Sequence, residues 1–427
     1  MIGVGVDRAS GDPARAASST EPPRPDRPRP DPYAPERDAW TVLAAIDGLG
    51  PVAFTALLTR YGTGSAILRA AAEPDGPRDL ASTPPREHVP GERVRAPVTE
   101  AIAAAIATAA DTADSTIERV RSAGLRVITM EEPAYPRRLA AIAMPPHVLF
   151  VRGSAAALSP ERAVAVVGTR RPTTYGRSTA GRIAMALAAA DATIVSGLAY
   201  GVDGAAHEAT LGAGGTTVAV IGGGHAALSP RGHDRLAAAI VDGGGAVISE
   251  YAPDVIPTVG TFPRRNRIIS GLTDATVVVE APARSGALIT ASWALEQGRE
   301  CFIVPGPIDS RASAGALAFL REWPDAARVV AGIPQLIADL GLVDREDAAS
   351  NDAVAAATLQ GMGEVESVIA RAIVRGRVTV DEIAATSGLP VASVLAAIVM
   401  LERRGLVAGI QGRYRPAGTL LGGGSRA

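Results

Sequence analysis

The chain has 427 residues, a formal net charge of −2, 47% hydrophobic residues and 4% aromatic residues. All 42 of its Lys and Arg positions are arginine, because the sequence contains no lysine. Schiff-base chemistry, phosphate capture by a P-loop and general-base catalysis by lysine need an ε-amine, so these mechanisms are excluded. The single cysteine, Cys301, excludes a disulfide framework and a cysteine-based zinc site. The near-neutral charge still permits a local basic patch.

The sequence also limits the size class and location of the protein. Its length corresponds to about two to four domains. No apolar run reaches the roughly 18–20 residues of a membrane-spanning helix. The opening residues, MIGVGVDRAS, lack the charged-then-apolar layout of a signal peptide, so we expect a cytoplasmic protein with no membrane partner. Cys301 stands in the apolar run ECFIVPG and is expected to be a buried, unreactive thiol.

The N-terminal part of the chain has two segments of different composition. Residues 1–38 alternate Pro, Arg and Asp, which predicts a disordered arm that buries no core. Residues 39–125 predict a helical domain of the helix-hairpin-helix or SAM-like kind, with two short helices around Gly48–Pro51. The second helix could take a phosphate on its first N–H groups, although ordinary packing explains the pattern slightly better. We expect a loop over 71–97 and one helix over 98–123.

Residues 126–335 alternate apolar, β-branched runs with Ala-rich helical segments. Such runs are apolar on both faces, which indicates parallel strands covered by helices on both sides. The expected fold class is α/β, with an extended Rossmann-like, doubly wound parallel sheet. Ligands in such sheets bind at the carboxyl ends of the strands. The expected strands cover residues 163–168, 193–197, 217–223, 246–251, 276–281 and 301–306.

The C-terminal part begins with an acidic linker, residues 336–360. Residues 361–416 predict three helices followed by a β-hairpin, the pattern of a winged-helix domain. The second helix is expected to end at Gly388, and the third to lie between Pro390 and Gly405. Residues 417–427 form a tail. The winged helix could bind duplex DNA or a protein, and the sequence leaves both open.

The strongest candidate site is the run TFPRRNRIISGL, residues 261–272. Arg264, Arg265 and Arg267 fall within four positions, close to an expected helix start, where anions are already favoured. Guanidinium groups match phosphate geometry, and Phe262 offers a surface for stacking a nucleobase. Asn266 lies within the same cluster. A solvated charged turn is the less favoured alternative, because a solvated face rarely crowds like charges without acids.

Glycine-containing turns follow three of the expected strands. Because parallel strands end at one edge of the sheet, these turns and the arginine cluster should meet there. Glycine lets a phosphate approach the backbone, and Arg170 adds charge. The sequence therefore predicts an anion-binding rim with four or five arginines. The turns are Gly168-Thr169-Arg170-Arg171, Ser196-Gly197-Leu198-Ala199 and Gly222-Gly223-Gly224.

The interpretation of this edge as an active site is weaker. Ser196, Asp203 and His207 lie close in sequence, but VSGLA is not the G-x-S-x-G turn of a nucleophilic serine. We expect Asp203 and His207 to hydrogen-bond each other as a structural pair, since they lie four residues apart on one helix. No metal-ligand spacing such as H-E-x-x-H occurs. The sequence therefore predicts no catalytic residues, no metal and no cofactor.

Several runs, in their order and spacing, resemble the DprA (Smf) family of DNA-processing proteins. The resemblance is close over about residues 126–330, and the flanking helical and winged-helix parts also look like those of the family. Tyr200 departs from the family pattern, where arginine is usual, and Ser229 stands where tyrosine is usual. The matching runs are AVVGTRRPTTYG, VSGLAYGVDGAAH, TVAVIGGG, ISEY, FPRRNRIISGL, VVVEAPARSGALITASWALEQGRE and VPGPID.

The resemblance implies a non-enzymatic homodimer that binds and protects single-stranded DNA and loads the recombinase RecA onto it in natural transformation. It places the DNA in a basic pocket at the carboxyl edge of the sheet. A nucleotide-processing hydrolase that uses the same pocket is the alternative, with Glu280 as the nearest candidate for a catalytic acid. Carried over motif by motif, the contact residues are Gly168, Arg170, Ser196, Gly197, Phe262, Arg264, Arg265, Asn266 and Arg267.

Overall fold

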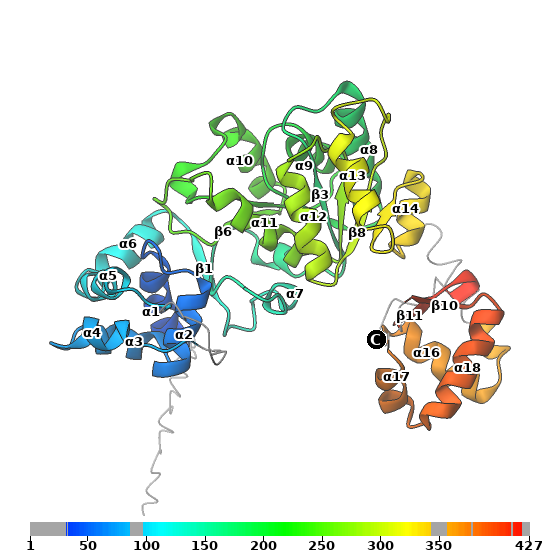
Figure 1. Ribbon diagram of the computed structural model, residues 1–427, viewed down its shortest axis with the longest axis horizontal. Helices are drawn as coiled ribbons and strands as arrows, with labels where there is room; N and C mark the ends of the chain where they lie inside the picture. The colour runs from blue at the N-terminus through cyan, green and yellow to red at the C-terminus, as the bar shows by residue number, and fades with distance from the viewer. Residues whose placement is uncertain are drawn as a thin grey trace, which may run out of the picture.

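The computed structural model describes residues 31, 33–85, 97–342, 357–376, 379–410 and 413–420. Most of the expected arm and much of the expected linker lie outside these ranges. Figure 1 shows three regions along the chain: a helical N-terminal region, a central α/β domain and a small C-terminal domain.

The N-terminal region is helical, as the sequence predicts. Its hairpin consists of α1, Ala34–Ala44, and α2, Pro51–Tyr61, joined by a turn in which Gly48 has a φ of +82°. The first helix begins inside the stretch expected to be disordered. Arg37 of α1 donates hydrogen bonds of 2.9 and 2.6 Å to the two carboxylate oxygens of Glu132. This ion pair anchors the helix to the central domain.

Two expectations for the rest of this region were wrong. A short helix replaces part of the loop expected from residue 71, because Leu80 is fully buried in the helical core. The single helix expected over 98–123 is broken at Thr112, a β-branched residue whose φ of −112° and ψ of 18° leave the helical range. The elements are α3, Gly64–Ala71; α4, Gly76–Ala81; α5, Glu100–Asp111; and α6, Ala113–Ser122.

The central domain is built on a nine-stranded sheet with the order β1-β2-β6-β5-β4-β3-β7-β8-β9. Neighbouring strands are parallel from β6 to β9, whereas β2 pairs antiparallel with both β1 and β6. All the expected strands are present, and the doubly wound α/β fold is confirmed; β1, β2 and β9 were not expected. The strands are β1, Arg126–Thr129; β2, Val148–Gly153; β3, Ala163–Val167; β4, Thr193–Ser196; β5, Thr217–Val220; β6, Ala246–Ser249; β7, Ala275–Val278; β8, Glu300–Ile303; and β9, Ala327–Val329.

Helices cover both faces of this sheet, which explains why its strands are apolar on both sides (Figure 1). Val164 and Val166 of β3 pack in the core beneath α8, whereas Ala165 and Val167 pack in the core beneath α11. On the first face lie α8, Thr174–Ala189; α9, Val202–Gly212; α10, Asp234–Asp242; and α14, Ile333–Asp339. On the second lie α7, Arg137–Ala140; α11, Thr261–Gly271; α12, Gly286–Glu296; and α13, Ala314–Glu322.

Two details of the central domain bear on the sequence predictions. Leu336 of α14 is buried in the core, so the first residues of the expected linker belong to the folded domain. Cys301 of β8 is fully buried, and burial raises the pKa of its thiol to about 12. The expectation of a buried thiol is therefore confirmed.

The C-terminal domain has the three helices and the β-hairpin expected of a winged helix. Thr379 and Glu382 form a capping box at the start of the second helix, and Gly388 ends it with a φ of +69°. The elements are α16, Glu364–Val374; α17, Val380–Ser387; α18, Val391–Arg403; β10, Val407–Ile410; and β11, Arg413–Pro416.

Much of the exposed surface of α18 is apolar, although Glu402 and Arg403 at its end are also exposed. Val391, Leu395 and Val399 lie four residues apart along it and are 43–52% exposed. A helix that reads base edges in a duplex needs hydrogen-bond donors and acceptors on its exposed face. The two roles that the sequence leaves open for the winged helix, binding of duplex DNA and contact with a protein, stay predictions.

The described helices include none that is by itself long and apolar enough to cross a membrane. One bent pair, α17 and α18, meets the length and composition of a span across a bend of 113°. Within the part of the chain that the structure describes, no cluster of three or more His, Cys, Asp or Glu side chains could hold a metal ion.

Candidate nucleic-acid interface

The carboxyl ends of β3, β4, β5 and β7 meet at one edge of the sheet. The strand order reverses between β3 and β7, a position at which open α/β sheets bind ligands. Glu280 lies two residues after the end of β7, and its carboxylate accepts hydrogen bonds of 3.0 and 2.6 Å from the N–H and hydroxyl of Thr173, the N-cap of α8. A carboxylate thus already occupies the anion-favouring end of α8. The N-terminus of α8 is therefore already neutralised and does not need an external anion.

Arg265 is buried beneath this edge, with 3% of its surface exposed. Its guanidinium group donates hydrogen bonds to the carbonyl oxygens of Val220 and, at 2.8 Å, of Gly197. The N–H groups of Gly197 and Ala199 in turn donate to the carboxylate of Asp203, at 3.1 and 3.4 Å. Gly197 has to be glycine, because a Cβ there would lie 2.5 Å from Nη1 of Arg265. Arg265 and Asp203 therefore hold the turn after β4 between them.

The charges of Arg265 and Asp203 compensate each other inside the protein. Burial lowers the pKa of Arg265 to about 10, and the nearby Asp203 opposes that shift. Burial raises the pKa of Asp203, against the opposing effect of Arg265. At neutral pH Arg265 is charged. Its guanidinium group interacts with carbonyl oxygens and with Asp203 inside the protein and not with groups at the surface.

Arg267 is also buried, and it has an acidic partner. Its guanidinium group donates hydrogen bonds of 2.9 and 2.6 Å to the two carboxylate oxygens of Glu250, and its Nε donates to the carbonyl of Met144 at 2.8 Å. Burial disfavours the charged form, but hydrogen bonds to Glu250 raise the pKa of Arg267 above its ordinary value. The expectation that no acid offsets the arginine cluster was therefore wrong for Arg267.

Two other predicted contact residues direct their polar groups inward. The hydroxyl of Ser196, fully buried, donates a 2.7 Å hydrogen bond to the carbonyl of Val166 in β3. The amide of Asn266, 8% exposed, donates a 3.0 Å hydrogen bond to the carbonyl of Gly286 at the start of α12. Ser196 thus joins β4 to β3, and Asn266 joins α11 to the start of α12.

The expected hydrogen bond between Asp203 and His207 is not formed. The carboxylate of Asp203 faces the turn after β4, whereas Nδ1 of His207 lies 2.7 Å from the hydroxyl of Thr217 in β5. His207 is fully buried, and burial lowers its pKa to about 3, so its ring is neutral at physiological pH. The prediction failed because the strand beside α9 offers a closer hydroxyl partner than the previous helical turn does.

The remaining predicted residues lie at the same edge of the sheet, with Gly222 buried against Phe262. We call Gly168, Arg170, Gly222, Phe262 and Arg264 the rim. Arg170 and Arg264 are exposed, and the guanidinium carbon of Arg170 lies 5.3 Å from the ring centroid of the half-buried Phe262. Phe262 lies against Gly222, where a Cβ would approach its ring to 2.8 Å. The turns after β3 and β5 and the start of α11 thus come together, as the sequence predicts.

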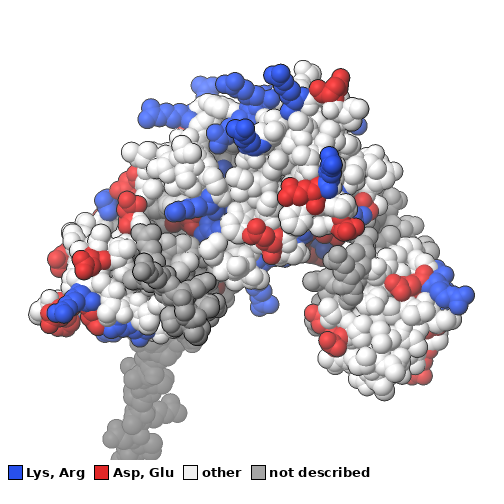
Figure 2. Space-filling model, in the orientation of Figure 1, with Lys and Arg blue, Asp and Glu red and all other residues white. Residues whose placement is uncertain are grey.

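The surface view agrees with a basic edge. Cationic side chains gather along the upper margin of the central domain in Figure 2, and acidic side chains lie mostly lower on the same face. The near-neutral net charge of the chain therefore conceals an uneven distribution.

Sequence reasoning missed the acid that pairs with Arg267. A signal for it existed, because Glu250 stands near the carboxyl end of the expected strand 246–251, in ISEY, and so belongs to the same edge as the arginines. Sequence reasoning also did not separate the buried arginines of the cluster from the exposed ones. Helical periodicity gives no signal here, because all seven residues that follow Arg264 in α11, Arg265–Gly271, are buried.

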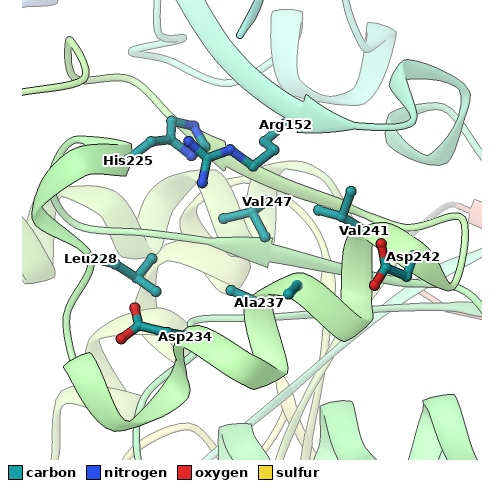
Figure 3. A pocket seen from close by; sticks show the side chains of 9 residues that line it. Arg152, His225, Leu228, Asp234, Ala237, Val241, Asp242 and Val247 are labelled. Carbon is teal, nitrogen blue, oxygen red and sulfur yellow. The ribbon is translucent and has the colours of Figure 1, made fainter. Parts of the chain in front are cut away.

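A separate hollow of about 280 Å³ lies along α10, away from the rim (Figure 3). Its floor is apolar, with Leu228, Val241 and Val247, and Arg152 of β2 points toward it beside His225. It shares no lining residue with the rim. The hollow therefore does not extend the basic edge.

Comparison with known proteins decides the family. A family model described as DNA recombination-mediator protein A matches residues 126–341, which is half of the chain. The chain belongs to the DprA family. A second model of this family, described as the DprA winged helix domain, matches residues 353–413.

Individual DprA relatives agree over most of the chain. The chain is 39% identical to Protein Smf of Escherichia coli (strain K12) over 291 residues, which is 67% of this chain and 76% of that protein. It is 38% identical to the putative DNA processing protein DprA of Mycobacterium tuberculosis (strain H37Rv) over 319 residues, 71% of this chain and 80% of that protein. The X-ray structure of DprA from Streptococcus pneumoniae has a TM-score of 0.57 and 29% identity, and the alignment covers 70% of this chain and 97% of that one. The predicted family resemblance is confirmed.

Proposed function

We propose that the protein binds single-stranded DNA across the rim, with Arg170 on a phosphate and Phe262 beneath a nucleobase. The observation that carries this proposal is the pairing of an exposed guanidinium with an aromatic ring, 5.3 Å apart, at a glycine-lined edge. A guanidinium group suits phosphate, and an aromatic ring suits an unpaired base. In a duplex the bases are stacked on each other, so this combination favours a single strand.

The buried members of the cluster act as positioning residues in this proposal. Arg265 fixes the turn after β4, and Arg267 fixes the end of β6 through Glu250. Both keep α11 in place, and α11 carries Phe262 and Arg264. A rim whose parts are held in this way loses little conformational entropy on binding. Contact between DNA and the buried groups would require these hydrogen bonds to open.

The role in the cell follows from the family and remains part of the proposal. As a recombination mediator, the protein would protect incoming single strands in the cytoplasm and load RecA onto them during natural transformation. We propose that it acts as a homodimer and without enzymatic turnover. The alternative, a nucleotide hydrolase with Glu280 as its acid, is disfavoured because both oxygens of that carboxylate are bound to Thr173.

The decisive experiment is a salt titration of the affinities for oligo-dT and for a duplex of equal length, with RecA filament formation followed alongside. We expect tighter binding to oligo-dT and faster RecA filament growth on DNA that carries the protein. Equal affinity for both DNAs, lost equally with salt, would contradict a single-strand function. Nucleotide turnover that disappears in Glu280→Gln would instead support the hydrolase.

A further inference from the structure

A second aromatic ring stands exposed at the same edge of the sheet. Tyr200 lies in the turn between β4 and α9, and half of its surface, 50%, is accessible. Burying an exposed ring of this size against an apolar surface is favourable, and none of the hydrogen bonds that hold the edge together uses its side chain. Tyr200 is therefore available for contact with a ligand.

The ring of Tyr200 is held in a fixed place by the loop before α10. Its centroid lies 4.8 Å from that of His233, with the two rings at 79° to each other. Its hydroxyl end packs against Gly232, where a Cβ would come within 2.6 Å of the oxygen. His233 is itself anchored, because its Nδ1 lies 2.9 Å from the carbonyl oxygen of Leu198. Because the ring is already held in place, it loses little conformational entropy when a base stacks on it.

The turn that carries Tyr200 is in direct contact with the turn that carries Arg170. Gly201, with a φ of +87°, packs against the backbone of Thr169 and Arg170, which leaves no room for a Cβ. Arg170 in turn lies against Phe262. The turn that carries Tyr200 thus packs beside the turn that carries Arg170, and the guanidinium group of Arg170 lies over Phe262.

We propose that Tyr200 stacks on a nucleobase of the bound strand whose neighbouring phosphate is held by Arg170. This inference rests on the proposed single-strand function and adds a base-contacting residue to it. Stacking of this kind tolerates any base, because every base has an aromatic face. A purely structural Tyr200 would support the loop before α10 without touching DNA.

The test compares Tyr200→Ala and Tyr200→Phe on two ligands of equal length and charge: oligo-dT and an oligonucleotide of abasic residues. Tyr200→Ala should weaken oligo-dT binding about 5- to 150-fold and leave abasic binding within twofold, while Tyr200→Phe should bind both as the parent does. Trp323→Ala, which removes an exposed ring at the far end of α13, is the matched control and should change neither affinity.

Three outcomes overturn the inference: unchanged oligo-dT affinity in Tyr200→Ala, an equal loss on both ligands, or a loss in Tyr200→Phe as large as in Tyr200→Ala. Tyr200→Leu, which keeps apolar bulk against His233, separates stacking from a folding defect, and thermal melting of each variant accompanies the titrations. Failure of the proposed function would give a different set of results in these binding measurements. In that case the parent protein fails to prefer oligo-dT, or Arg170→Ala has no effect on its binding.

Discussion

Arg170 and Phe262 form a cation–π pair in which the guanidinium carbon lies 5.3 Å from the ring centroid. One residue follows β3 and the other begins α11, so the pair exists only after the sheet has assembled. The ring holds the guanidinium group without using its N–H donors, which stay free for a phosphate. By contrast, Arg265 and Arg267 of the same sequence run are buried: Nη1 of Arg265 donates to two carbonyl oxygens, and Arg267 donates to Glu250.

Replacing Arg170 tests the rim directly. We expect Arg170→Ala to weaken oligo-dT binding by about 1–3 kcal/mol, because a charge-assisted contact to phosphate is lost. Fluorescence anisotropy at fixed salt measures this change. Arg321→Ala, which removes an exposed arginine from the last turn of α13, is the control and should bind as the parent does. Equal losses in both variants would mean that Arg170 contributes only general charge.

Replacing Arg265 should affect stability before it affects binding. Arg265→Ala leaves two carbonyl oxygens and the carboxylate of Asp203 buried without their partner, which costs about 3–5 kcal/mol of unfolding free energy. Arg170→Ala, at an exposed position, should change the unfolding free energy by less than about 0.5 kcal/mol. Urea denaturation followed by circular dichroism compares the two. A stable Arg265→Ala protein with strongly reduced DNA affinity would show that Arg265 contacts DNA itself.

The ion pair between Arg267 and Glu250 should contribute far more to the unfolding free energy than an exposed ion pair does. Glu250→Gln removes the charge that offsets a buried guanidinium and should cost about 3–5 kcal/mol. Asp254→Asn breaks the exposed pair with Arg119, whose atoms are 3.4 Å apart, and should cost less than about 1 kcal/mol. Both are measured by urea denaturation. Similar costs for the two variants would contradict a structural role for the buried pair.

The salt dependence of oligo-dT binding should report the number of exposed cations in the interface. Each phosphate neutralised on a single strand contributes a slope of about −0.7 in a plot of log affinity against log salt concentration. We expect Arg170→Ala and Arg264→Ala each to reduce the steepness of the slope by about 0.7. A double variant with an unchanged slope would place the DNA elsewhere on the protein.

Acid should destabilise the protein through its buried histidines. Burial lowers the pKa of His147 and His225 to about 4 and of His207 to about 3. The folded state therefore keeps these rings neutral while the unfolded state takes up protons near pH 6.5. Their contribution to the unfolding free energy is fully present above that pH. It is lost as the pH falls toward the folded-state pKa values, by about 1.4 kcal/mol per pH unit for each ring.

Urea denaturation at pH 7.5 and pH 5.5 measures this loss. The variant His225→Gln should lose less stability between the two pH values than the parent does, and the difference isolates one ring from other titrating groups such as Asp203. An identical pH response of the parent and the variant would exclude His225 as a source of the effect.

Much of the central fold follows from local pattern. Buried parallel strands such as β3 and β7 read as continuous apolar runs, and their spacing by helices sets the doubly wound order. The short helix α4 could not be predicted in the same way. Its composition favours a loop, and only the burial of Leu80 against the other N-terminal helices stabilises it.

The sequence by itself determined the kinds of chemistry available: arginine as the sole cationic side chain besides histidine, glycine at the strand ends, and an aromatic ring beside three arginines. It could not determine which of those arginines reach solvent. That depends on the side of α11 that packs against the ends of β4 and β5 and on the acids, Asp203 and Glu250, that other segments bring beneath it. Burial and ion pairing are properties of the assembled domain, because each needs partners that lie far apart in the chain.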